Sequence, residues 1–118
     1  MRPHEKLDLW RRAIAFVVSV YRVTERFPKE EKFGLTSQIR RAAVSIAANV
    51  AEGAARTSMK EFLQFLSVSQ GSASEADTEL VIACRLGYLT KDEYEHFGRE
   101  LDDIGRMITR LSQSLRRR

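Results

Sequence analysis

The sequence predicts an all-α fold, an antiparallel up-down-up-down four-helix bundle that forms a single domain over residues 1–118. Apolar residues recur at steps of three and four in four separate segments, and no segment alternates with a period of two. Both prolines, Pro3 and Pro28, lie outside these segments, so no proline interrupts a helix. Short linkers between the segments favour antiparallel neighbours. The expected helices cover residues 8–27, 35–54, 58–86 and 90–115.

The first two segments differ in the bulk of their apolar residues. The first carries two adjacent apolar rows, which predicts a helix with a broad buried face. The rows are Leu9, Ala13, Phe16, Val20, Val23 and Phe27, and Trp10, Ile14, Val17 and Tyr21. The second segment has one row, Leu35, Ile39, Ala43, Ile46 and Val50, and is rich in alanine from residue 42 to 55. Small side chains let a neighbouring backbone approach closely, so we expect this helix to be tightly packed.

The last two segments begin at capping sequences. Ser58 and Thr90 are each followed three residues later by a glutamate, which is typical of a helix N-terminus. Gly87 suits the end of the third helix. The predicted core rows are Phe62, Leu66, Ser69, Ala73, Ala76, Leu80 and Ala83, and Phe97, Leu101, Ile104, Ile108, Leu111 and Leu115.

Composition excludes several classes of protein. The single cysteine, Cys84, cannot form an intramolecular disulfide or a multi-cysteine zinc site. No apolar run approaches the roughly 20 residues of a membrane span, so we expect no membrane association. A lone thiol is compatible with a cytoplasmic location, which is the expected one. The net charge of +4 owes three units to Arg116, Arg117 and Arg118, so it is weak evidence for nucleic acid by itself.

The residues offer no catalytic or metal-binding set. The two histidines, His4 and His96, lie in polar surroundings, and a di-iron bundle site needs two Glu-x-x-His pairs where the chain has only Glu93 and His96. No zinc-type spacing or glycine-rich phosphate loop occurs. We therefore expect a protein that is not an enzyme and needs no cofactor or metal.

Two polar rows lie at helical spacing beside the core rows. The second helix carries Gln38, Arg41, Ser45, Asn49 and Glu52, and the third carries an acidic edge of Ser72, Glu75 and Glu79. One hypothesis joins these rows in a hydrogen-bonded seam between helices or subunits, with Arg41 paired to a buried Glu75. The other is a basic nucleic-acid-binding surface formed by Arg40, Arg41, Arg56 and Lys60, together with the C-terminal Arg116, Arg117 and Arg118.

Several motifs resemble a known family over almost the whole chain, from about Leu7 to Leu115. They are Phe27-Pro28-Lys29-Glu30-Glu31-Lys32-Phe33-Gly34-Leu35, Gln38-Ile39-Arg40-Arg41-Ala42-Ala43-Val44-Ser45-Ile46, Asn49-Val50-Ala51-Glu52-Gly53 with Arg56, and Phe65-Leu66 followed by Gly71-Ser72 and Glu75. Together they resemble the four-helix-bundle proteins named for intervening sequences of 23S rRNA genes. Ala47 departs from the pattern, since many members carry proline there.

The resemblance implies a four-helix bundle that assembles into a ring of five subunits. It does not imply one biochemical role. Some relatives are encoded inside intervening sequences of rRNA genes, and others stand alone. A similar bundle is the accessory protein of diversity-generating retroelements, where a basic ring works with a reverse transcriptase and nucleic acid.

Two functional hypotheses follow. The first is a non-enzymatic homo-oligomer, a pentamer by resemblance, that binds RNA or DNA through basic residues. Surplus apolar residues near the start of the third helix favour assembly, and five copies of a +4 chain carry +20. The alternative is an oligomeric scaffold or accessory subunit that binds a partner protein and no nucleic acid.

Overall fold

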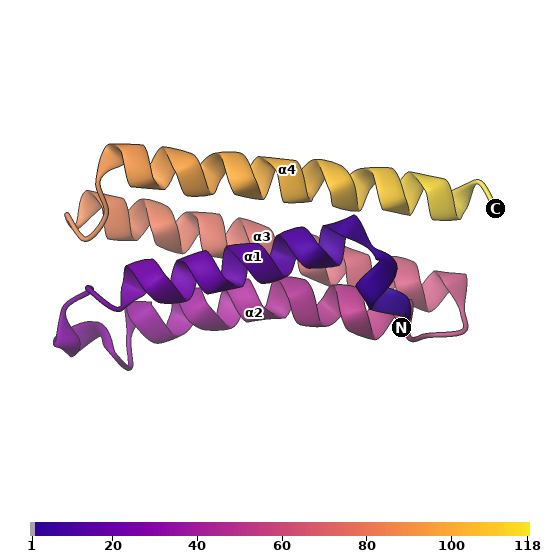
Figure 1. The fold of residues 1–118 in the computed structure, drawn as a ribbon, viewed down its shortest axis with the longest axis horizontal. Helices are drawn as coiled ribbons and strands as arrows, with labels where there is room; N and C mark the ends of the chain where they lie inside the picture. Colours follow the sequence, from indigo (N-terminus) through magenta and orange to yellow (C-terminus); the bar gives the residue numbers. More distant parts are fainter. Residues whose placement is uncertain (1) are drawn as a thin grey trace.

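Four long helices make up almost all of the protein in a computed structural model that describes residues 2–118, apart from the side chain of Lys6. They are α1 (Asp8–Thr24), α2 (Leu35–Ala54), α3 (Met59–Arg85) and α4 (Lys91–Arg116). Two short 3₁₀-helices, η1 (Pro3–Lys6) and η2 (Lys29–Glu31), precede α1 and α2. Successive long helices run in alternate directions (Figure 1). The prediction of an all-α four-helix bundle is confirmed.

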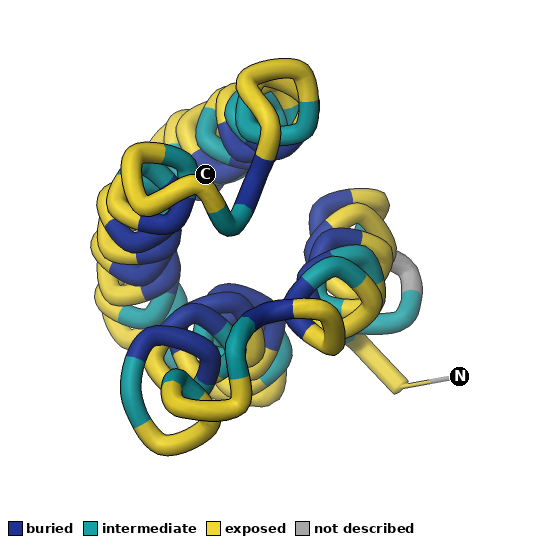
Figure 2. The backbone as a smooth tube through the Cα atoms, turned by 90° about the vertical axis from the view of Figure 1, so that its left-hand side faces the viewer, coloured by how far each residue is buried: buried dark blue, intermediate teal, exposed yellow. Residues whose placement is uncertain are grey.

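The core lies along the axis of an elongated molecule that measures 46 × 23 × 22 Å. The buried face of each long helix points toward this axis (Figure 2). Phe16, Ile39, Leu66 and Ile104, one from each helix, are all at most 1% exposed. Burial of such a side chain contributes about 1.5–3 kcal/mol. The main apolar row of each helix therefore lies on the core face. The second row of α1 is not buried as predicted, because Ile14 and Tyr21 are 38% and 41% exposed.

Helix α1 ends three residues earlier than its apolar periodicity predicts. Its last residue, Thr24, is buried, and its hydroxyl donates a hydrogen bond of 2.7 Å to the carbonyl of Val20. Phe27 remains in the core but belongs to the turn that leads to Pro28. A proline disfavours helical geometry in the residue before it, which explains why the helix stops ahead of Phe27.

The closest helix pair is α2 and α3, as the alanine-rich sequence of α2 indicates. Gly53 is buried between them: a Cβ atom there would lie 2.9 Å from Phe62 Cδ1 and 2.9 Å from Phe65 Cβ. The buried hydroxyl of Ser69 donates a hydrogen bond of 2.9 Å to the carbonyl of Ile46. Small residues and a satisfied hydroxyl thus permit close backbone approach.

The helix termini follow the capping signals. Ser58 Oγ accepts a hydrogen bond from the Glu61 N–H. Thr90 and Glu93 form a reciprocal capping box. Gly87 has a φ of +83° just after α3, a conformation that favours glycine.

The antiparallel arrangement places both termini and the α2–α3 turn at one end of the bundle (Figure 1). The α1–α2 and α3–α4 connections lie at the other end. Within residues 2–118, no helix has the length and apolar character that crossing a membrane requires.

Candidate nucleic-acid interface

The second half of α4 is strongly basic. No acidic residue occurs from Ile104 to the end of the chain, whereas five arginines do. All five are exposed, although Arg106 also forms an ion pair with Asp103. Arg116 lies in the last turn of α4, where a cation interacts favourably with the helix dipole. The arginines are Arg106, Arg110, Arg116, Arg117 and Arg118.

Arg106 and Arg110 did not figure among the residues that we expected from the sequence. The signal that identifies them is the absence of acidic residues over the last 15 positions, not a spacing motif. The three C-terminal arginines, which the sequence analysis did include, continue the basic second half of α4 to the end of the chain.

Arg56 and Lys60 lie at the α2–α3 turn, at the same end of the bundle. Arg56 is held by Glu52 at 3.1 Å and Glu61 at 3.7 Å, and its guanidinium stacks 5.0 Å from the ring centroid of Phe65. Two carboxylates therefore offset its charge. Lys60 is exposed in the first turn of α3.

The fold separates charge along the bundle, which the net charge of the chain conceals. Apart from residues 1–6, which carry +1, the half with the termini comprises residues 7–16, 46–72 and 104–118, with nine basic and three acidic residues, or +6. The other half comprises residues 17–45 and 73–103, with nine basic and twelve acidic residues, or −3. We call the first of these the basic end. A positive field of this kind attracts polyanions.

Arg40 has a structural role that the sequence-based interpretation did not predict. Its Nε donates to Thr24 Oγ1 at 2.8 Å, and its Nη2 donates to the Tyr21 carbonyl at 3.2 Å. The guanidinium also stacks on the Tyr21 ring, 4.4 Å from the centroid. Arg40 therefore joins α2 to α1 and lies far from the basic end.

The polar rows of α2 and α3 meet at their centre. The hydroxyls of Ser45 and Ser72 are 2.8 Å apart, and Asn49 Nδ2 donates to the carbonyl and the hydroxyl of Ser45 at 2.8 and 2.9 Å. Glu52 does not join this group, because it pairs with Arg56. An open groove of about 560 Å³ runs along the seam. Its lining comprises Gln38, Arg41, Ala42, Ser45, Ser72 and Glu75.

Arg41 and Glu75 line this groove but form no ion pair within the described residues. Both are exposed. The buried Arg41–Glu75 pair of the seam hypothesis is thus absent from the described part of the single chain.

Glu79, which the sequence analysis places on the acidic edge of the third helix, is buried in the structure. It is only 7% exposed, and its Oε1 has no hydrogen-bond partner among the described residues. Burial, the negative charge of Glu75 and a hydrogen bond between the two carboxyl groups raise the pKa of Glu79 to about 7.

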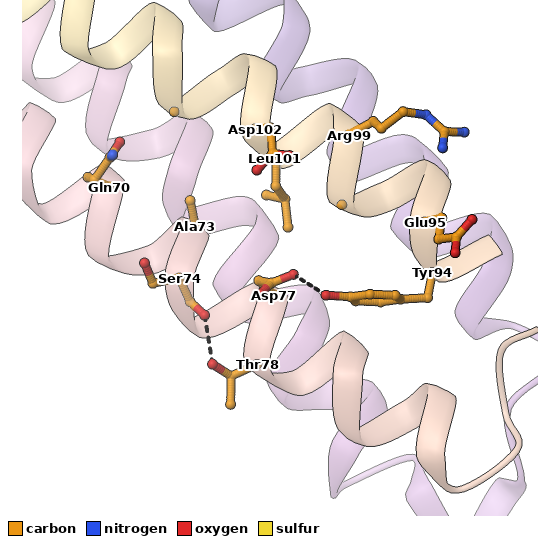
Figure 3. Close-up of a pocket in the computed structure, with 12 residues that line it drawn as sticks. Gln70, Ala73, Ser74, Asp77, Thr78, Tyr94, Glu95, Arg99, Leu101 and Asp102 are labelled. Atoms are coloured by element: carbon orange, nitrogen blue, oxygen red, sulfur yellow. Dashed lines mark hydrogen bonds between the residues drawn. The ribbon is translucent and has the colours of Figure 1, made fainter. Parts of the chain in front are cut away.

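A larger groove of about 660 Å³ lies between α3 and α4 (Figure 3). Asp77, Glu95 and Asp102 give it an acidic character that Arg99 only partly offsets. Tyr94 donates a hydrogen bond of 2.9 Å to Asp77 Oδ1 across the groove (Figure 3). This groove does not suit a phosphate group.

Toward the basic end, the same two helices form a smaller groove of about 220 Å³. Neutral hydrogen-bonding side chains and one cation line it, and such groups suit a sugar-phosphate strand better than the acidic groove does. The polar residues are Ser67, Gln70, Thr109, Ser112, Gln113 and Arg116.

The described residues contain no group of three or more histidine, cysteine, aspartate or glutamate side chains that could hold a metal ion. His96 Nε2 lies 2.7 Å from Glu100 Oε1, and the His4 ring packs against Trp10. Neither histidine lines one of the three grooves.

Comparisons with known proteins relate this chain to a protein family and to a solved structure. None of the curated proteins matches the sequence. A crystal structure of a protein of unknown function from the S23 ribosomal protein family of Bacteroides thetaiotaomicron matches with a TM-score of 0.79. The two chains are 22% identical, and the match covers 88% of this chain and 97% of the other, so it shows a shared fold. Residues 5–110 match the family model of the 23S rRNA-intervening sequence protein. The chain therefore belongs to the 23S rRNA-intervening sequence protein family.

Proposed function

We propose that the protein is a non-enzymatic, homo-oligomeric nucleic-acid-binding protein of the cytoplasm that contacts phosphates through its basic end. The observation that supports this function is the separation of charge along the bundle, +6 against −3. Basic residues that gather on one surface attract a phosphate backbone more strongly than the same residues spread evenly.

The contacts that we propose come from α4 and the α2–α3 turn. Arg110, Arg116, Arg117 and Lys60 are exposed at the basic end, and none of them forms an ion pair within the described residues. The small α3–α4 groove beside Arg116 adds hydroxyl and amide groups for sugar or base contacts. Arg40 is not part of this surface, and Arg56 contributes less because Glu52 and Glu61 offset its charge.

Binding, not catalysis, fits the grooves best. None of the three contains a histidine or a cysteine, so none places a nucleophile beside an imidazole base. The hydroxyl pair of Ser45 and Ser72 is bonded to Asn49, which is not a general base.

Self-association is supported by apolar side chains on two different faces. Ile14, Val18 and Tyr21 are exposed on α1, and Val68 and Ile82 are exposed on α3. Surfaces of this kind commonly form subunit contacts. The resemblance to the family implies five copies, which would bring five basic ends into one assembly.

A salt titration of RNA binding tests the function. Fluorescence anisotropy with a labelled single-stranded RNA should show affinity that falls steeply with salt, because phosphate contacts release counterions. The double variant Arg110→Gln and Arg116→Gln should lower the slope of log K against log [salt] by about 1.4, or about 0.7 per lost contact. Arg85→Gln removes an exposed cation from the other half and is the matched control, with an unchanged slope.

Two results would contradict the proposed function. One is the absence of RNA and DNA binding by the wild-type protein at low salt. The other is an equal loss of slope in the Arg85→Gln control, which would mean non-specific attraction. Recovery of one stoichiometric protein from nuclease-treated lysate, without nucleic acid, would support the scaffold alternative instead.

A further inference from the structure

The half of the bundle away from the termini has two sides of opposite charge. Residues 17–45, from α1, η2 and α2, carry six basic and three acidic residues. Residues 73–103, from α3 and α4, carry three basic and nine acidic residues. The α1–α2 pair and the α3–α4 pair form different sides of the molecule (Figures 1 and 2). The two sides are electrostatically complementary, +3 against −6.

Each side also presents apolar side chains to solvent. Ile14, Val18 and Tyr21 follow one another at steps of four and three along α1 and are 38%, 42% and 41% exposed. On α3, Val68 and Ile82 are 52% and 44% exposed. Two complementary surfaces on one chain favour a heterologous contact, in which one side of a copy meets the other side of the next.

The acidic side contains an incomplete ion cluster at Glu79. The side chain is 7% exposed, and its carboxyl group hydrogen-bonds with that of Glu75. Its Oε1 has no partner in the part of the chain that the structure describes. From α2, Gln38 and Arg41 line the adjacent groove with Glu75, yet no ion pair joins Arg41 to either glutamate in the described chain. A buried carboxylate without a cation is costly, so a cation from outside would stabilise its charged form.

Arg22 on α1 lies at the same height along the bundle as this carboxyl pair. Ser45 contacts Ser72, and Arg40 contacts Tyr21, which fixes the relative levels of α1, α2 and α3. Counting along the antiparallel helices from these contacts places Arg22 level with residues 75–79. Arg22 is exposed in the last turn of α1, beside the apolar residues of that helix.

We propose that a second copy of this chain docks side by side, in the same axial direction, and places its Arg22 guanidinium at the Glu75–Glu79 carboxyl pair. The Ile14, Val18 and Tyr21 strip of the second copy then lies along α3 toward the basic end, where Val68 is exposed. This contact rests on the homo-oligomer of the proposed function and identifies its two surfaces. Because the copies share one axial direction, their basic ends lie on the same rim of the assembly.

Charge reversal tests the contact. Sedimentation equilibrium should show that Arg22→Glu weakens self-association at least tenfold, as expected for a close charge pair at an interface. Glu75 is exposed, so Glu75→Arg should weaken it similarly without disturbing the core. The double variant with both changes restores the opposite charges in swapped positions and should recover much of the lost affinity. Arg110→Glu, the same charge change at the basic end, should leave self-association unchanged.

Protonation gives a second, independent test. In the free copy, burial and Glu75 hold the pKa of Glu79 near 7, whereas the second copy's Arg22 favours the ionised form. Association therefore releases a proton and should tighten as the pH rises from about 5 to 7, then level off. Glu79→Gln should remove most of this pH dependence while far-UV circular dichroism confirms an intact fold.

The outcomes separate the contact from the function on which it rests. A wild-type protein that stays monomeric at high concentration would overturn both the contact and the homo-oligomer. An oligomeric wild type that Arg22→Glu and Glu75→Arg leave unchanged would overturn the contact alone. Loss of RNA binding by Arg110→Glu, with assembly intact, would support the basic end independently.

Discussion

Replacement of Gly53 by alanine tests whether the close packing of α2 against α3 depends on that glycine. The added Cβ would lie 2.9 Å from Phe62 Cδ1, 2.9 Å from Phe65 Cβ and 3.3 Å from the Phe62 carbonyl oxygen. The Phe62 ring can rotate, but the Cβ of Phe65 is fixed to the backbone of α3. The two helices must therefore separate to accept one methyl group.

Two opposing effects determine the size of the change. Overpacking in a core costs about 1–3 kcal/mol, whereas alanine is favoured over glycine in a helix by up to about 1 kcal/mol. Because Gly53 is the penultimate residue of α2, the full propensity gain does not apply. We expect the free energy of unfolding to fall by about 1–2 kcal/mol.

Urea denaturation followed by circular dichroism at 222 nm measures this change. The matched control is Gly98→Ala in α4, where a Cβ would have no atom within 4 Å outside its own helix. That substitution should raise the free energy of unfolding by up to about 1 kcal/mol. Both proteins should be compared with wild type at one concentration, since self-association adds to apparent stability. If Gly53→Ala is as stable as Gly98→Ala, the close contact with Phe65 does not limit the packing.

Three further substitutions have expected effects on the dissociated chain. The folded-state pKa of Glu79, about 7, exceeds its ordinary value of 4.5, so the native state binds the proton more tightly than the unfolded chain does. The free energy of unfolding should therefore fall by up to about 3 kcal/mol as the pH rises from 4.5 to 7. Glu79→Gln should flatten this part of the plot of urea midpoint against pH, and an unchanged plot would contradict the raised pKa. Arg40→Ala should destabilise the protein by about 1–2 kcal/mol in thermal unfolding through loss of its bonds to Thr24 and Tyr21, without a change in the salt slope of RNA binding. Arg41→Ala should change the free energy of unfolding by less than about 0.5 kcal/mol, because Arg41 is exposed and forms no ion pair with Glu75 within the described residues. A loss of about 3 kcal/mol would instead indicate the buried pair.

The helices and their caps could be predicted because the signals are local. The apolar rows of α2 and α4 repeat at helical spacing, and each row lies on one face whatever the rest of the chain does. Thr90 and Glu93 cap α4 through atoms that are three residues apart. The end of α1 was predicted three residues late because Phe27 stays in the core after the helix has stopped.

The candidate site could be predicted only in part, because its geometry depends on contacts between distant segments. Arg40 resembles any exposed basic residue until the fold places Thr24 and Tyr21 beside it. Glu79 shares a helix edge with Glu75, but in the folded bundle Glu79 is buried and Glu75 is exposed. Burial of this kind is not encoded by spacing along one helix.

The sequence by itself determined four amphipathic helices, a single-chain core and the membership of a family, because helical periodicity and motif residues are properties of the chain. Only the tertiary structure decided how the charged residues are distributed over the two ends of the bundle. Antiparallel packing brings the end of α4 to the α2–α3 turn, and it leaves the acidic parts of α3 and α4 together at the other end. A net charge of +4, of which residues 1–6 carry +1, therefore becomes a basic end of +6 and an opposite half of −3, because electrostatic potential depends on where charges lie in space.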